Sequence, residues 1–415
     1  MLGWRRTNAS RRRDLPLEGQ ILLLVTLVLV AFGQVMVYSA SSAYALTHDE
    51  FGHDPLHFVK AGAIYTVIGV IALLVVMRAR PSWLRVAGPL ILVVSLCLLV
   101  AVLVPGVGVE VNGARRWLAF GPITFQPSEL AKIGLLGTCA ALLAARRHAP
   151  ERISDLVPIG AVAAFACGLV LVEPDLGTAI SMALMIGGML VVAGIRTGLM
   201  LRVALVVVTV GTLAVFAEPY RRDRLLAFMD PWSQSGDGAY QVVQAMIAIG
   251  SGGLTGVGLG GSVQKVNYLP EAHTDMIFAV IGEELGLVGA LFVIVLFAAF
   301  AWAGFTIALR ARDRFSQLVA AGATSLVAGQ AVVNLCAVMG IMPLTGIPLP
   351  LISHGSSSRV ATLFLVGVLL AISRESVGVA AAAVREPEAD EPVEAQPRAT
   401  QRAAPAPRRR RAAAR

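Results

Sequence analysis

The sequence predicts an all-α integral membrane protein with about ten transmembrane helices, because long apolar runs alternate with short polar segments. Of its 415 residues, 56% are hydrophobic and only 14% are charged. A soluble domain carries roughly 25% charged residues. Runs of about 20 apolar residues, long enough to cross a bilayer as a helix, recur along nearly the whole chain. This composition excludes an ordinary soluble protein.

We expect a polytopic domain at 19–376 between a cytoplasmic tail at 1–18 and a second tail at 377–415. The second tail consists mainly of Ala, Pro, Glu and Arg, a composition that favours disorder. The predicted helices lie near 19–38, 58–77, 84–105, 127–145, 155–172, 174–194, 200–217, 275–306, 316–340 and 358–376.

Basic residues predict the orientation of these helices. They gather before the first helix and in alternate loops, which the positive-inside rule places in the cytoplasm. Both termini are then cytoplasmic, and loops 39–57, 106–126, 218–274 and 341–357 lie on the outer face. The loop residues that define this pattern are Arg78, Arg80, Arg85, Arg146, Arg147, Arg152, Arg196, Arg202, Arg310, Arg312 and Arg314.

Ionisable residues gather where the long outer loop enters the predicted helix at 275–306. Glu271, His273 and Asp275 precede it, and Glu283 and Glu284 follow inside it. Such residues at membrane depth are functional candidates by default. In a straight helix Glu284 lies roughly 13 Å deeper than Asp275 and on the opposite side. We therefore expect Glu283 and Glu284 to be buried supporting residues, whereas Asp275 is either a helix-capping acid or a catalytic one.

Basic residues on the outer face are the candidate anion-binding groups. Arg115 and Arg116 oppose the positive-inside trend, and Glu129 and Lys132 are spaced to meet on one helix face. Lys132 can form a structural ion pair or bind a pyrophosphate. The glycine-rich run 251–261 permits close backbone approach, for which we favour helix packing over phosphate binding. No spacing of His, Cys or acidic residues predicts a dedicated metal site.

Several motifs occur in an order that resembles the SEDS family (shape, elongation, division and sporulation) of bacterial peptidoglycan polymerases. The resemblance covers roughly residues 17–375 and is nearer to the division branch than to the elongation branch. Positions 354 and 356 depart from it, because His and Ser stand where the family usually has an aromatic residue and a glycine. The motifs lie at 38–41, 112–117, 126–132, 174–178, 230–232, 248–253, 269–275 and 346–353.

This resemblance implies a glycosyltransferase that polymerises lipid II on the outer face of the plasma membrane during septal division and releases undecaprenyl pyrophosphate. Asp275 is the implied general base. The implied substrate- and pyrophosphate-binding residues are Arg115, Arg116, Lys132 and Lys265, with Arg224 a weaker candidate. The supporting residues are Glu129, Asp175, Glu271, His273, Glu284 and Ser353.

The resemblance also implies partners. A class B penicillin-binding protein supplies transpeptidase activity, and its single helix is expected near the eighth and ninth predicted helices. A divalent cation such as Mg²⁺ can assist the leaving group. Three alternatives stay open: a lipid II flippase, a scaffold that recruits division proteins, and a polymerase of elongation or sporulation.

Overall fold

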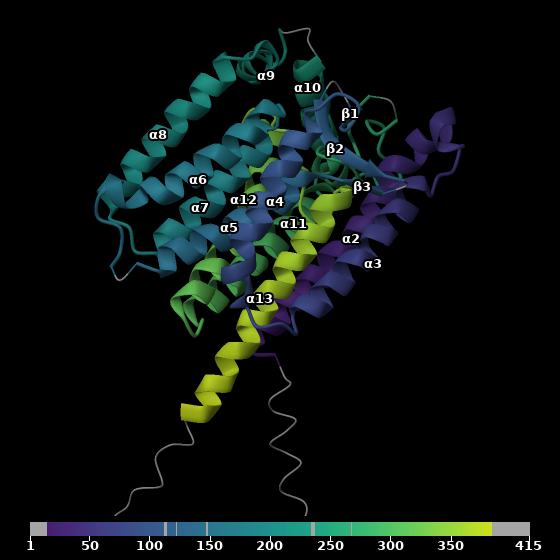
Figure 1. Cartoon of the computed structure of the whole chain (residues 1–415). Coiled ribbons are helices and arrows are strands. Elements are labelled where there is room, and N and C mark those ends of the chain that lie inside the picture. The colour runs from purple at the N-terminus through teal and green to yellow at the C-terminus, as the bar shows by residue number, and fades with distance from the viewer. Residues whose placement is uncertain are drawn as a thin grey trace, which may run out of the picture.

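The protein is a bundle of long helices with a small sheet and two short helices at one end (Figure 1). This computed structural model describes residues 15–383 except 112–113, 122, 147, 234–236 and 267. Most of both predicted tails therefore lies outside the described residues. The start of the purple helix and the end of the yellow helix, near the two ends of the described chain, lie at the end of the bundle away from the sheet (Figure 1).

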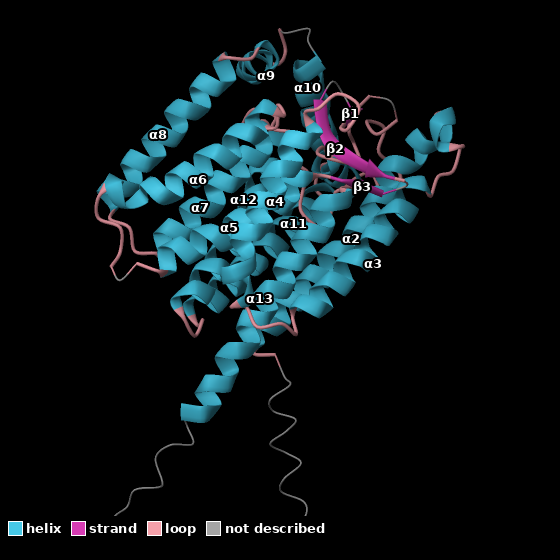
Figure 2. Ribbon diagram, viewed as in Figure 1, coloured by secondary structure: helices cyan, strands magenta, loops and turns pink. Residues whose placement is uncertain are grey.

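The predicted helical class is confirmed (Figure 2). Within the described residues, 9 helices are long and apolar enough to span a membrane, and the apolar helix α7 is shorter at 17 residues. A 17-residue helix is about 25 Å long, somewhat less than the hydrocarbon core. The helices are α2 Leu17–Thr47, α3 His57–Val76, α4 Trp83–Val102, α5 Pro127–Ala144, α6 Ile153–Val172, α7 Leu176–Val192, α8 Thr197–Phe216, α9 Pro219–Met229, α10 Asp237–Ser251, α11 Ile277–Leu309, α12 Arg314–Val338 and α13 Ser356–Ala383, with a single 3-10 turn at Asp49–Phe51.

Helices α5, α12 and α13 form the centre of the bundle. In each, 78% of the apolar window is buried inside the protein, whereas in α8 the figure is 6%. Helix α4 packs on α5, α7 on α12, α3 on α13, and α11 on both α2 and α12. Helix α8 contacts α7 and α9 at the periphery, so its apolar side chains are left to face lipid.

A three-stranded antiparallel sheet occupies the segment that the sequence predicted as an outer loop. Its strands are β1 Val109–Val111, β2 Ala114–Phe120 and β3 Ile123–Phe125, in the order β1-β2-β3. Two strands have only three residues, and β2 lacks regular alternation of apolar and polar residues. Period-two alternation is the main sequence signal for a strand, so these strands were not predictable.

Helix α11 is broken at Gly286, whose backbone angles are φ 63° and ψ −158°. The glycine-rich run packs directly against this break. The amide of Val257 donates to the Glu283 carbonyl (3.0 Å), and the amide of Leu287 donates to the Gly253 carbonyl (3.0 Å). A Cβ placed on Gly256 would lie 2.1 Å from the Glu284 carbonyl oxygen. The glycines therefore serve backbone packing here, the interpretation that the sequence favoured.

Candidate active site

Asp275 lies two residues before the first residue of α11, in a turn that follows the glycine-rich run. Its side chain is half-buried. Its backbone carbonyl accepts a hydrogen bond from the Asn334 side-chain amide (2.7 Å), and the same nitrogen donates to the Ile347 carbonyl (2.8 Å). Asn334 in α12 therefore holds the Asp275 turn beside the segment that precedes α13.

A small cavity lies at Asp275. It is bounded by the start of α11, the end of α12 and residues 344–347. Its volume is about 10 Å³, room for a single water molecule at most. Asn334 is 2% exposed, and its side-chain oxygen lacks a hydrogen-bond partner in the described part of the protein. The site thus combines a carboxyl group and an unsatisfied hydrogen-bond acceptor beside a very small cavity.

The surroundings raise the pKa of the Asp275 carboxyl to about 6. Desolvation is the main cause, and the negative charge of Glu271 adds to it. The positive charge of Arg224 and the Thr274 hydroxyl, 3.3 Å from Oδ1, oppose the shift. A carboxyl with this pKa is deprotonated at pH 7 and is a stronger base than an ordinary aspartate.

Arg224 is the cation that the structure brings nearest to the Asp275 cavity among those considered from sequence. It projects from α9, and its Nη1 donates to the carbonyl of Leu344 (3.4 Å), a residue that lines the cavity. The sequence ranked it below four other basic residues. The closeness of Arg224 to the cavity depends on how α9 packs on the bundle. The sequence does not predict the path of the loop that contains α9, so it could not predict this contact.

The other predicted cations are held by structural partners. Lys132 pairs with Glu129 (2.8 Å) within α5, and both side chains are buried. Lys265 pairs with Glu284 (2.7 Å), and Ser39 of α2 donates to the same carboxylate. Within the described residues, neither lysine lines the Asp275 cavity.

The two arginines of β2 have different partners. Arg115 pairs with Glu110 (3.1 Å) on the neighbouring strand, and its side chain is 38% exposed. Arg116 donates to the carbonyls of Glu173 (2.9 Å) and Pro174 (2.6 Å). It therefore fixes the sheet to the turn between α6 and α7.

That turn contains the predicted supporting residue Asp175, whose carboxylate caps α7 by accepting from the Thr178 amide (2.9 Å). Its second oxygen accepts from the Gln126 side chain (3.3 Å). The neighbouring Glu173 is fully buried, and desolvation raises the pKa of its carboxyl to about 8. Glu173 is not among the residues predicted from sequence, since burial of its side chain carries no sequence signal.

The remaining supporting residues fix loop conformation. Ser353 accepts from the Leu349 amide (2.8 Å), and Glu271 accepts from the Thr274 hydroxyl (2.6 Å). Glu283, deeper in α11, accepts from the Val263 amide (3.0 Å) and from the Ser262 hydroxyl. Glu283 and Glu284 thus bind the loop that precedes Asp275 and do not reach the Asp275 cavity.

His273 and the unusual His354 lie in an aromatic cluster beside this loop. The His273 ring lies 4.3 Å from the Phe58 ring, and its carbonyl accepts from the His354 amide (2.9 Å). Burial lowers the pKa of both imidazoles, that of His354 to about 3. His354 is therefore neutral at pH 7. Among the described residues, no group of three His, Cys, Asp or Glu side chains is arranged to hold a metal ion.

Comparison with known proteins gives consistent matches over this fold. A family model for FtsW, RodA and SpoVE proteins, described as "Cell cycle protein", matches residues 20–377. The probable peptidoglycan glycosyltransferase FtsW of Geobacter metallireducens is 39% identical, over 86% of this chain and 95% of its own. Stage V sporulation protein E of Bacillus subtilis is 37% identical, over 86% of this chain and 97% of its own.

Two solved structures share the architecture. One is a chain from work described as structural coordination of polymerization and crosslinking by a peptidoglycan synthase complex; its TM-score is 0.71 at 29% identity, over 86% of this chain and 97% of that chain. The other is the rod shape determining protein RodA of Thermus thermophilus, with a TM-score of 0.64 at 29% identity, over 85% of this chain and 96% of that chain.

Proposed function

The chain belongs to the FtsW/RodA/SpoVE family of cell cycle proteins, and from this premise we propose that it is a peptidoglycan glycosyltransferase that polymerises lipid II. Relatives named as probable FtsW-type glycosyltransferases at about 40% identity support this activity. The observation that carries the assignment to a site is the Asp275 carboxyl, half-buried beside a cavity with its pKa raised to about 6.

Asp275 is the proposed general base. An alcohol is a weak nucleophile, so its proton must be removed as the new bond forms. The Asp275 carboxylate accepts the proton of the sugar 4-hydroxyl while that oxygen bonds to the anomeric carbon of the lipid-linked chain. The bond from this carbon to the pyrophosphate oxygen breaks at the same time, and the electron pair leaves with undecaprenyl pyrophosphate.

Positive charge near this centre stabilises the leaving pyrophosphate. Arg224 contacts the wall of the Asp275 cavity and is the first candidate. Arg115 is the second, because its pair with Glu110 is exposed and such pairs are worth only about 0–1 kcal/mol. We assign Arg116, Lys132 and Lys265 to support of the fold around the site, since each binds a carbonyl or a carboxylate. A divalent cation such as Mg²⁺, bound to the pyrophosphate group of the substrate, can add to this positive charge.

A partner is part of the proposal. The cavity at Asp275 is far too small for a disaccharide, which leads us to propose that residues 344–347 and the Asp275 turn separate when substrate binds. A class B penicillin-binding protein that stabilises the open arrangement would activate the enzyme. The match to a chain of a peptidoglycan synthase complex supports such an assembly, and the FtsW names support a role at the division septum.

Replacement of Asp275 tests the proposal. We expect Asp275→Asn to lower the rate of lipid II polymerisation at least about 100-fold, because a positioned base contributes about 10²–10⁴-fold. The measurement is gel analysis of glycan strands that purified protein makes from labelled lipid II, with and without the partner.

Asp49→Asn is the matched control, because it removes an exposed carboxylate of a predicted outer loop that does not line the cavity. Its rate should stay within a few fold of the unsubstituted protein. Full polymerisation by Asp275→Asn would remove Asp275 as the base. Loss of lipid II transport with intact polymerisation would favour the flippase instead.

A further inference from the structure

A second cavity lies at the opposite end of the bundle from Asp275. Asp275 contacts the end of α12, whereas this cavity is formed at the start of α12, beside the last residues of α5 and the residue after α7. Its volume is about 310 Å³. The positive-inside pattern places this end of the bundle in the cytoplasm. The reaction proposed at Asp275 does not use it.

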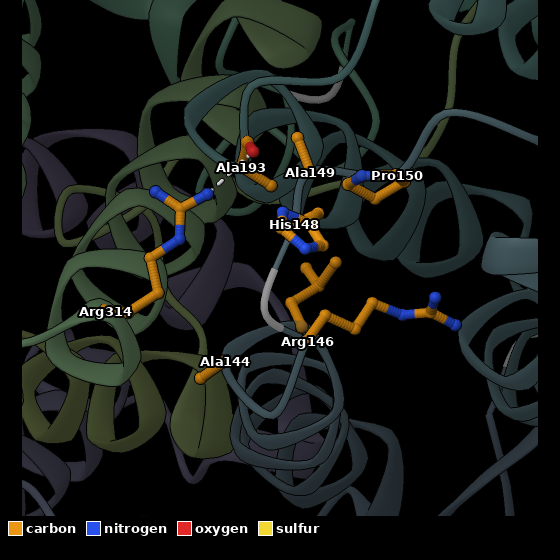
Figure 3. A pocket seen from close by; sticks show the side chains of 8 residues that line it. Ala144, Arg146, His148, Ala149, Pro150, Ala193 and Arg314 are labelled. Atoms are coloured by element: carbon orange, nitrogen blue, oxygen red, sulfur yellow. Dashed lines mark hydrogen bonds between the residues drawn. The ribbon is translucent and has the colours of Figure 1, made fainter.

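Cationic side chains and an apolar wall line this cavity together (Figure 3). Arg146, His148 and Arg314 supply the polar part, and Leu143, Pro150 and Ala193 are among the apolar residues. Figure 3 shows the His148 ring between the two arginines. Within the described residues, no carboxylate lines the cavity. A site of this composition favours an anion attached to an apolar group.

Arg314 is held in place by the protein. Its guanidinium donates to the carbonyls of Ala193 (2.6 Å) and Val192 (3.1 Å), which closes the end of α7. The neighbouring Asp313 carboxylate accepts from the Phe315 amide (3.0 Å) at the start of α12, and within the described residues it forms no ion pair with Arg314. A fixed guanidinium presents its charge at little entropic cost.

Arg146 and His148 remain adaptable. Arg146 pairs with Asp155 at 3.5 Å, and the two side chains are 29% and 34% exposed, so the pair is weak. Asp155 is also engaged by the Arg152 amide (2.9 Å). The exposed His148 ring makes no hydrogen bond or ion pair with the part of the protein that the structure describes. Both side chains are therefore able to turn toward a bound anion.

We propose that this cavity binds the phosphate-bearing headgroup of an anionic phospholipid from the cytoplasmic leaflet. Arg146, His148 and Arg314 contact the phosphate, and Leu143 and Ala193 contact the apolar start of the lipid. Basic pockets between membrane helices on the cytoplasmic side bind such headgroups, and volumes of about 300–1,000 Å³ are usual for ligand sites. The apolar wall, which includes Leu143, Pro150 and Ala193, favours a lipid over free phosphate.

Lipid binding to the full chain tests this site. Native mass spectrometry of the purified protein would be run with short-chain phosphatidylglycerol, with phosphatidylcholine, and with phosphatidylglycerol in competition with inorganic phosphate. We expect Arg146→Gln to weaken phosphatidylglycerol binding about fivefold, since one basic residue near a lipid surface contributes about 1 kcal/mol. Ala149→Phe, which fills the cavity without changing charge, should also reduce it.

The matched control is Arg202→Gln, an exposed arginine of α8 that does not line the cavity; its binding should be unchanged. Equal binding of phosphatidylglycerol by the protein and both cavity variants would overturn the proposal. Equal retention of phosphatidylcholine would overturn the requirement for negative charge. Complete displacement by inorganic phosphate at matched concentration would identify a free-phosphate site and overturn the lipid assignment.

Discussion

At the scale of single residues, two neighbours of Asp275 act on its carboxyl in opposite directions. Glu271 raises the pKa of Asp275, and Arg224 lowers it. Desolvation is larger than either and leaves the pKa at about 6, above the ordinary value of 3.8. A general base is active only when deprotonated, so activity should be present above this pKa and be lost as the pH falls through it.

The two neighbours predict opposite shifts of the pH profile. Polymerisation should reach half its maximal rate near pH 6 and fall about tenfold per pH unit below that. Glu271→Gln should move this midpoint to lower pH, and Arg224→Gln should move it to higher pH. Initial rates on labelled lipid II between pH 5 and pH 8 measure both shifts. Displacement of both midpoints in one direction would contradict the electrostatic account.

The sequence predicts the base better than the groups around it. Asp275 lies in a recognisable motif, and an ionisable residue at the membrane boundary is a functional candidate because its burial there is costly. The sequence contains no comparable indication of which groups the basic residues bind. Arg116 binds two carbonyls of a distant turn, and Arg224 reaches the cavity through the fold of α9. Those contacts depend on tertiary structure, which residue type and spacing do not specify.

At the scale of elements, apolar length was sufficient to predict nearly all of the helices, because a bilayer leaves few alternatives to a hydrogen-bonded helix. The break in α11 was not predictable in the same way. Gly286 lies within a continuous apolar run, and a glycine there is compatible with a straight helix. The break follows from packing of the glycine-rich run against the helix, a contact with residues about 30 positions away.

Gly286 should therefore be intolerant of a side chain. Its φ of 63° and ψ of −158° lie in a region that glycine alone occupies readily, and an added Cβ would lie 2.4 Å from the Gly256 amide nitrogen. We expect Gly286→Ala to lower the free energy of unfolding by about 1–3 kcal/mol or more. The measurement is the thermal unfolding midpoint in detergent.

Gly160→Ala is the control for this prediction. Gly160 lies in α6 with open space around the added methyl group, so alanine should stabilise the helix by about 1 kcal/mol at most. Equal midpoints for the two variants would show that the break in α11 is not required for stability.

At the scale of the whole molecule, the position of basic residues predicts that Asp275 faces outward. Single cysteines at His53 and Arg312 test this, since both side chains are exposed and the predicted topology puts them on opposite sides. A membrane-impermeant maleimide applied to intact cells should label His53→Cys and leave Arg312→Cys unlabelled. The native thiols Cys97, Cys139, Cys167 and Cys336 lie within helices. The reverse pattern would place Asp275 in the cytoplasm.

If the site opens as proposed, the two hydrogen bonds of Asn334 contribute to the ratio of closed to open molecules. One side-chain nitrogen holds the Asp275 turn and the Ile347 segment together, so opening breaks both bonds. At about 0.5–1.5 kcal/mol each, they favour the closed form by about 1–3 kcal/mol, or about 5–150 closed molecules for each open one. The apparent affinity for substrate is lowered by this same factor, because only the open form binds it. These two bonds therefore account for an activation of at most this factor by a partner protein that binds the open form alone.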